Sequence, residues 1–313
     1  MSSPLSQHPH AEMSLLHISD THLLGGARKL YGHLETATRL EQLLQRVADS
    51  DERPAALVFT GDLADIGEED AYRNLRSVVE PVAREIGAEV IWVMGNHDKR
   101  GPFAKVLLDA DNSGEPLDRV YHLQGLRLIV LDTSVPGFHH GELTSDQRGW
   151  LADVLATPAP RGTLLAMHHP PIPTPLEIMG VIELDDQQQF WSILEGSDVR
   201  AILAGHLHYS TFSAFQGIPV SVAAALCYNI DLIARGGTLL GGIDGGHSSS
   251  LVSIYPDQVV FSEVLPGPAP EIFHRSDDPL ADIRQWSPDK RRAVFSDKSS
   301  EFNQGEEKQQ AGG

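Results

Sequence analysis

The sequence is poor in cysteine, in basic residues and in long apolar runs. Its one cysteine, Cys227, excludes an intramolecular disulfide framework and a cysteine-rich zinc module. It has 24 Lys and Arg against 43 Asp and Glu, which argues against a nucleic-acid partner because sequence-independent binders need a cationic surface. No apolar run approaches the roughly 20 residues of a membrane-spanning helix, and residues 1–10 do not resemble a secretory signal. We therefore expect a cytoplasmic protein without a transmembrane segment.

Composition divides the chain into a globular part and a polar end. Gly267-Pro268-Ala269-Pro270 disrupts regular structure, and the sequence is polar from there to residue 313. We therefore predict a flexible N-terminus over 1–12, a domain over 13–266 and a flexible tail over 267–313. The basic cluster of the tail, Lys290-Arg291-Arg292, carries too little charge for strong membrane attraction, so peripheral association with the envelope is kept only as an alternative.

Apolar patterns of two different periods alternate along the predicted domain. Helical spacing of apolar residues marks 40–47 and 72–86, and Thr144-x-x-Gln147 is typical of the capping box at a helix start. Strand–helix alternation predicts a largely parallel sheet, whereas Pro256-Asp257 between two late strands predicts an antiparallel hairpin. The fold class is therefore α/β, with two mixed sheets packed face to face and helices outside. The predicted strands are 14–18, 56–60, 89–94, 126–131, 163–167, 201–204, 219–224, 251–255 and 258–263.

Polar residues follow five of these strands at the point where each strand ends. The five motifs are Asp20-Thr21-His22, Gly61-Asp62, Gly95-Asn96-His97-Asp98, His168-His169 and Gly205-His206-Leu207-His208. Because parallel sheets place ligand sites at the carboxyl ends of their strands, we expect the motifs to converge on one edge. Gly61 and Gly95 leave space where the backbone passes close to such a site.

The side chains of these motifs suit metal ions. Carboxylate, amide and imidazole groups bind Mn, Fe, Zn and Co alike. The seven candidate donors are too many for one ion and match two, so one carboxylate must bridge, and Asp62 is the only carboxylate in the turn of its motif. The candidate metal ligands are Asp20, His22, Asp62, Asn96, His168, His206 and His208.

In order and spacing, the five motifs resemble those of the calcineurin-like metallophosphoesterases, and most closely the bacterial class III cyclic nucleotide phosphodiesterases. The resemblance covers roughly residues 14–265. It implies a four-layer α-β-β-α sandwich, often a homodimer, with a binuclear Fe–Mn or Zn-type centre at the C-terminal edge of the strands. It assigns Asp20, His22, Asp62 and His208 to one metal, and Asp62, Asn96, His168 and His206 to the other. It also implies that His97 is a catalytic histidine beside the metals and that Asn96 faces the substrate phosphate.

Differences between the motifs of this chain and those of related phosphoesterase families argue against membership of those families. Protein Ser/Thr phosphatases have Asp-Arg-Gly after the second motif and Gly-Asn-His-Glu as the third, where this chain has Leu63-Ala64-Asp65 and ends the third motif with Asp98. Purple acid phosphatases have a tyrosine ligand at the position of Asp65 and lack a counterpart of His22. Nucleases of the superfamily need an extended basic surface, which an acidic domain does not offer.

The expected reaction is hydrolysis of a small-molecule phosphodiester by a hydroxide that bridges the two metals. The expected substrates are 3′,5′- or 2′,3′-cyclic nucleotides such as cAMP. His97 would protonate the leaving alkoxide or stabilise charge on the phosphoryl oxygens. A broader phosphodiesterase or a phosphomonoesterase is the alternative, and a non-catalytic scaffold ranks last because every ligand position is filled.

Further polar residues near the motifs have less certain roles. Asp65 and Asp98 either orient the histidines or cap backbone turns. His139 and His140 lie on a glycine-flanked loop, and their contribution stays open. His169 is expected to be structural, since neighbouring residues of an extended chain face opposite ways.

Overall fold

A five-stranded mixed sheet carries the first three motifs. The computed structural model describes residues 5–26, 28–112, 114–267, 269–272, 276 and 280–304. In this sheet, β1 (Met13–Ile18), β2 (Ala56–Thr60) and β3 (Glu89–Val93) are parallel. The antiparallel hairpin of β12 (Ser249–Ile254) and β13 (Val259–Val264) extends it beside β1, which confirms the predicted hairpin.

A six-stranded mixed sheet carries the other two motifs. Its order is β4-β5-β6-β7-β9-β8, in which β5, β6, β7 and β9 are parallel and the two edge strands are antiparallel to their neighbours. These strands are β4 (Arg119–Leu123), β5 (Leu126–Leu131), β6 (Thr163–Met167), β7 (Val199–Ala204), β8 (Thr211–Phe215) and β9 (Ile218–Val222).

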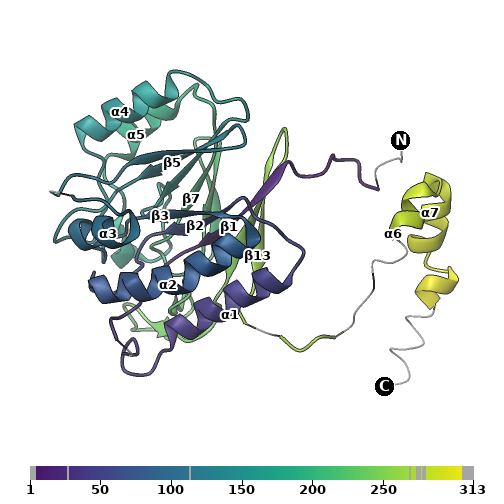
Figure 1. The fold of residues 1–313 in the computed structure, drawn as a ribbon, viewed down its shortest axis with the longest axis horizontal. Helices are drawn as coiled ribbons and strands as arrows, with labels where there is room; N and C mark the ends of the chain where they lie inside the picture. Colours follow the sequence, from purple (N-terminus) through teal and green to yellow (C-terminus); the bar gives the residue numbers. More distant parts are fainter. Residues whose placement is uncertain are drawn as a thin grey trace. The chain divides into compact units, whose positions relative to one another are not determined.

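The two sheets face each other between two layers of helices (Figure 1). Helices α1 (Thr36–Asp49), α2 (Glu69–Ile86) and α3 (Arg100–Leu107) cover the first sheet, and α4 (Ser145–Leu155) and α5 (Gln187–Leu194) cover the second. Between the sheets, side chains such as Leu15 and Val58 pack with Leu128, Leu164 and Leu203. The central strands are apolar on both faces because both faces are covered. The predicted four-layer α-β-β-α sandwich is therefore confirmed.

Sequence periodicity located the long helices but missed the two edge strands of the six-stranded sheet. Residues 40–47 and 72–86 lie in α1 and α2, and both hydrogen bonds of the Thr144–Gln147 capping box are present at α4. The predicted strands do not include β4 and β8, whose residues are largely exposed or half-buried. An edge strand needs no continuous apolar run, so its sequence gives a weak signal. Sequence periodicity also missed the short pair β10 (Asn229–Ile230) and β11 (Gly242–Ile243).

The chain divides into two units, Ala11–Pro268 and Met1–His10 together with Ala269–Gly313. The polar tail, expected to be flexible, contains two short helices, α6 (Leu280–Gln285) and α7 (Pro288–Phe295). Ser287 caps α7 by accepting a hydrogen bond from the Lys290 amide. The parts of the predicted flexible ends that fall on 1–4, 268, 273–275, 277–279 and 305–313 lie outside the described residues. No helix within the described ranges is long and apolar enough to cross a membrane.

Candidate metal centre

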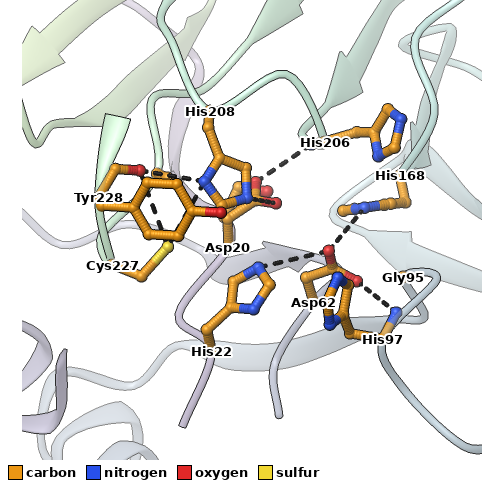
Figure 2. A network of polar contacts seen from close by, with 12 residues as sticks. Asp20, His22, Asp62, Gly95, His97, His168, His206, His208, Cys227 and Tyr228 are labelled. Carbon is orange, nitrogen blue, oxygen red and sulfur yellow. Dashed lines mark hydrogen bonds and ion pairs between the residues drawn. The ribbon is translucent and has the colours of Figure 1, made fainter. Parts of the chain in front are cut away.

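The ends of five strands from two sheets meet around Asp62 (Figure 2). Ligand atoms of Asp20, His22, Asp62 and His208 all lie within 4.8 Å of one another. These four residues are the set expected for one metal. They follow β1, β2 and β7, which belong to different sheets, so the predicted convergence arises from sheet-on-sheet packing as well as from neighbouring parallel strands.

Asp62 also faces the second set of donors. Its Oδ2 lies 3.4 Å from His22 Nε2 and 3.3 Å from His168 Nε2, so a single carboxylate oxygen is shared by both halves of the site. Asn96 Oδ1 lies 3.2 Å from the same His168 nitrogen, and the rings of His168 and His206 are 5.0 Å apart. The structure thus brings all seven predicted ligand residues together, with Asp62 between the two sets.

Each of the four candidate histidine ligands has one ring nitrogen hydrogen-bonded to a protein oxygen. The pairs are His22 Nδ1 with Asp65 Oδ1 (3.0 Å), His168 Nδ1 with Thr60 O (2.7 Å), His206 Nε2 with Ile182 O (2.9 Å) and His208 Nδ1 with Tyr228 O (3.0 Å). Such a bond fixes the tautomer, because the nitrogen that donates is protonated. The opposite nitrogen then carries a free lone pair, which is the arrangement that a metal-binding histidine requires.

Two polar atoms at the centre show directly that the site suits a cation. Asp20 Oδ1 and His22 Nε2 are buried and have no hydrogen-bond partner among the described residues. Buried polar atoms are almost always satisfied, so such an exception needs an explanation. No Lys or Arg of the described chain forms an ion pair with Asp20 or Asp62. Two buried carboxylates whose only ion-pair partners in the described chain are histidines fit metal ions, and the donor set matches a binuclear centre.

The electrostatics of the site reflect the close approach of carboxylates and imidazoles. Although burial lowers the pKa of His168, the neighbouring Asp62 carboxylate raises it to about 9. Burial raises the pKa of Asp62, but nearby His168 and His22 outweigh burial and hold that pKa well below its usual range. Burial together with neighbouring His168 lowers the pKa of His206 to about 3, so its imidazole is neutral at physiological pH. An ionised carboxylate and a neutral imidazole are the protonation states that bind metals.

The backbone around these donors is unusual. Asp20 (φ 52°), His22 (43°), Asp62 (49°), His206 (72°) and His208 (54°) all lie in the left-handed region. This region costs energy for residues other than glycine, and such outliers cluster at functional sites. Five of the seven predicted ligands therefore have a backbone conformation that local preference does not explain and that the arrangement of the site does.

Three glycines beside the donors have no room for a side chain. A Cβ on Gly61 would lie 2.4 Å from His168 Nδ1, and one on Gly95 would lie 2.2 Å from the Asp62 amide nitrogen. The third is Gly205, where an added Cβ would lie only 1.9 Å from Ser19 Oγ. The expected close passage of the backbone at Gly61 and Gly95 is confirmed, and Gly205 adds the same feature on the second sheet.

The two carboxylates whose roles were open have different contacts. Asp65 accepts a hydrogen bond from His22 Nδ1 and so orients a candidate ligand. Asp98 instead accepts from backbone amides and from one hydroxyl, and contacts no histidine in the described hydrogen-bond network. Asp98 therefore caps the turns after β2 and β3, where Asp62 and Asn96 lie.

Replacement of Asp98 by Asn is expected to destabilise these turns. Its two oxygens accept four hydrogen bonds, from the amides of Leu63, Ala64 and Gly95 and from the Tyr72 hydroxyl. An amide NH₂ in place of one oxygen would face two donors, at a cost of about 1–3 kcal/mol for each group left unsatisfied. The unfolding temperature and the metal content of Asp98→Asn should both fall. The control Asp153→Asn, on the exposed face of α4, should change neither. Unchanged stability and metal content in Asp98→Asn would contradict this role.

Several residues of the site gave no clear sequence signal. His139 Nδ1 accepts a hydrogen bond from Asn96 Nδ2 (2.8 Å), which turns Asn96 Oδ1 toward His168. His169 donates from Nε2 to the backbone oxygen of His139 (3.0 Å) and so supports this loop. Only the histidine-rich loop sequence could have pointed to His139. His140 lies 3.8 Å from Asp185.

Comparison with known proteins agrees with this geometry. Residues 13–210 match the calcineurin-like phosphoesterase family. The chain is 58% identical to a cAMP/cGMP dual specificity phosphodiesterase of Mycobacterium tuberculosis over 83% of this chain and 81% of that protein. It is 50% identical to a probable cyclic nucleotide phosphodiesterase of Rhodococcus erythropolis over 84% and 87% of the two chains.

The fold is also found among solved structures. A dimetal phosphatase from Danio rerio superposes with a TM-score of 0.59 at 14% identity, over 82% of this chain and 97% of that one. At this identity the likeness shows the fold alone. The family match spans more than half of the chain, and the two bacterial relatives are similar over most of both lengths. The chain therefore belongs to the calcineurin-like phosphoesterase family.

Proposed function

We propose that the chain is a metal-dependent phosphodiesterase that hydrolyses cyclic nucleotides, including 3′,5′-cAMP. The observation that carries this proposal is Asp62 Oδ2 between His22 and His168, with a set of donors on each side. A carboxylate shared in this way is what a two-metal phosphoester hydrolase requires. The names of the two bacterial relatives support a cyclic nucleotide as the substrate.

His97 and Asn96 are the protein groups that would act on the substrate. His97 donates its Nδ1 proton to the backbone oxygen of Asp65 (2.8 Å), which leaves Nε2 for a substrate oxygen. About a third of its side chain is exposed, so a substrate can reach it. A protonated Nε2 would donate to the leaving alkoxide or to a phosphoryl oxygen. Asn96, held by His139, would present its amide to the same phosphate.

The chain's residues divide the remaining tasks between them. Asp20, His22, Asp62 and His208 would hold one metal, and Asp62, Asn96, His168 and His206 the other. When bound, the pair supplies Lewis-acid charge and lowers the pKa of water toward neutrality. Asp65 and Thr60 O keep His22 and His168 in the correct tautomer for that task.

The finer points of the proposal concern the metals and the assembly. We propose an Fe–Mn pair, with Zn or Co as alternatives, because the mixed donor set accepts each of them. We further propose a homodimeric, cytoplasmic enzyme whose catalytic domain spans 13–266. Elemental analysis identifies the metals, and light scattering measures the oligomeric state.

One experiment tests the function directly. Metal content and turnover would be measured on the wild type and on Asn96→Ala, with 3′,5′-cAMP, 2′,3′-cAMP, an aryl phosphodiester and an aryl phosphomonoester as substrates. We expect two metal equivalents and diester turnover in the wild type, and a loss of at least about 10²-fold in Asn96→Ala, as for removal of one charge-stabilising donor. Asn74→Ala on the exposed side of α2 serves as the matched control.

The outcomes separate the candidate functions. Fast turnover of the monoester with none of the diesters would favour a phosphomonoesterase instead. Turnover of the aryl diester without either cyclic nucleotide would favour a broader phosphodiesterase. A fully metallated protein without any turnover would favour the binding scaffold.

A further inference from the structure

A cavity of about 380 Å³ is lined in part by Tyr228, whose ring lies beside the candidate ligand His208. Two tyrosines, Tyr31 and Tyr228, form part of its wall, together with Leu240, Ile243 and Asp244. The segments that meet here are the loop after β1, the turn before β10, and β11 with the residues around it. Neither the family resemblance nor the candidate ligand set gives this cavity a role.

Tyr228 connects the cavity to the candidate ligands. Its ring lies 4.6 Å from the His208 ring and 6.4 Å from the His22 ring. Its backbone oxygen accepts the hydrogen bond from His208 Nδ1 (3.0 Å). Figure 2 shows the Tyr228 ring directly beside His208. One ring, that of Tyr228, thus borders both the cavity and His208, and a molecule whose phosphate lies at the candidate metal centre would have to extend only past His208 to reach the cavity.

Tyr31 is an exposed aromatic ring held in a defined place. The loop that carries Tyr31 is anchored on either side of it by Leu30 and Leu34, which are buried and form a backbone bridge with each other. Its ring lies 5.6 Å from that of Tyr228 at an interplanar angle of 61°, and the two hydroxyls are 3.4 Å apart. Yet 68% of Tyr31 is exposed to solvent. An ordered aromatic face left open to solvent is suited to stacking against a planar ligand.

The charges around the cavity define which part of a ligand it suits. No Lys or Arg is among the described residues that line it, and its one carboxylate, Asp244, is paired with Arg39 and His247. A phosphate would face the Asp244 carboxylate without a Lys or Arg of the described lining, whereas an uncharged planar ring would gain stacking and apolar contact. A nucleobase has these properties, and its exocyclic amine can donate to a carboxylate such as Asp244.

We propose that this cavity is the nucleobase subsite of the enzyme and that Tyr31, with Tyr228 behind it, is the stacking platform. The inference rests on the proposed cyclic nucleotide substrate. A second cavity of about 450 Å³ adjoins Asn96 and His97 and is the competing location. Its one ring outside the histidines is Phe138, which packs edge-on against His140 (5.4 Å). Tyr31 and Tyr228 form a pair of phenol rings, which the described lining of the second cavity lacks.

The test compares Tyr31→Ala, Tyr31→Phe and the matched control Phe138→Ala in the metallated enzyme. The substrates are 3′,5′-cAMP and methyl ribofuranoside 3′,5′-cyclic phosphate, which has the same cyclic phosphate without a base. Tyr31→Ala should raise KM for cAMP at least about fivefold, as expected for loss of one stacked base. It should leave kcat for cAMP unchanged, and it should also leave KM for the base-free substrate unchanged. Tyr31→Phe keeps the ring and should behave as the wild type, and Phe138→Ala should leave KM for cAMP unchanged.

Two results would overturn the inference in different ways. If Tyr31→Ala leaves KM for cAMP unchanged while the wild type hydrolyses it, the subsite is wrong and the proposed function stands. An increase confined to Phe138→Ala would place the base in the second cavity. If the wild type hydrolyses aryl diesters but not cAMP, the proposed function fails, and the subsite fails with it.

Discussion

Asp62→Asn should lose metal from both halves of the site and lower kcat/KM for phosphodiesters by about 10³-fold or more. The oxygen proposed to be shared by the two metals, Oδ2, faces His22 Nε2 at 3.4 Å and His168 Nε2 at 3.3 Å. Oδ1 accepts the backbone amide of His97 (2.8 Å), a contact that an asparagine oxygen can keep. The amide NH₂ would then replace the shared oxygen, and it cannot ligate a metal. Metal ions contribute several kcal/mol to transition-state charge stabilisation, and each ~1.4 kcal/mol is tenfold in rate.

The isosteric change separates this effect from misfolding. Because the His97 amide contact survives, Asp62→Asn should fold and should show a normal far-UV circular dichroism spectrum. Elemental analysis should find less than one metal per chain, whereas Asp153→Asn, a control on the exposed face of α4, should keep two. Two retained metals with undiminished diester turnover would show that Asp62 is not the bridging residue.

The candidate site was predictable because each donor follows a strand. Asp20 follows β1, Asp62 follows β2 and His168 follows β6. Buried central strands are largely apolar, so the polar motif that follows each one stands out in the sequence. Because the central strands are buried on both faces, the layers of the fold and the position of the candidate site could both be predicted from the sequence.

Other features depended on contacts between distant segments. The sequence did not show that the motif strands are divided between two sheets, since strand order is set by packing rather than by local pattern. The left-handed backbone at Asp20 and His206 is equally invisible, because neither residue type demands it. Tyr31 and His139 gain their positions only when remote loops close around the motifs. Local chemistry thus identified the donors, and tertiary structure supplied the groups around them.

Gly205→Ala should have the second large effect, on both stability and metal binding. An added Cβ would lie 1.9 Å from Ser19 Oγ, 2.7 Å from Asp20 Oδ2 and 3.0 Å from Thr60 O. A carbon atom does not approach unbonded oxygen atoms so closely. The ends of β1 and β7 would therefore have to separate. Asp20 would move away from the His206 amide, with which it forms a hydrogen bond of 3.1 Å. Overpacking of this kind costs about 1–3 kcal/mol, and here it also displaces a candidate ligand.

The controls for this prediction have opposite expected signs. Gly149 in α4 has open space around its Cβ position, so Gly149→Ala should raise the unfolding temperature through its helix propensity. Gly205→Ala should lower it even in the presence of a chelator, because the clash does not depend on metal. Adding Ser19→Ala removes the closest contact and should restore part of the stability, but less of the metal affinity, since the Asp20 contact remains. A Gly205→Ala enzyme with wild-type stability and two metals would contradict the close packing of the two sheets at this edge, on which the convergence of the five motifs depends.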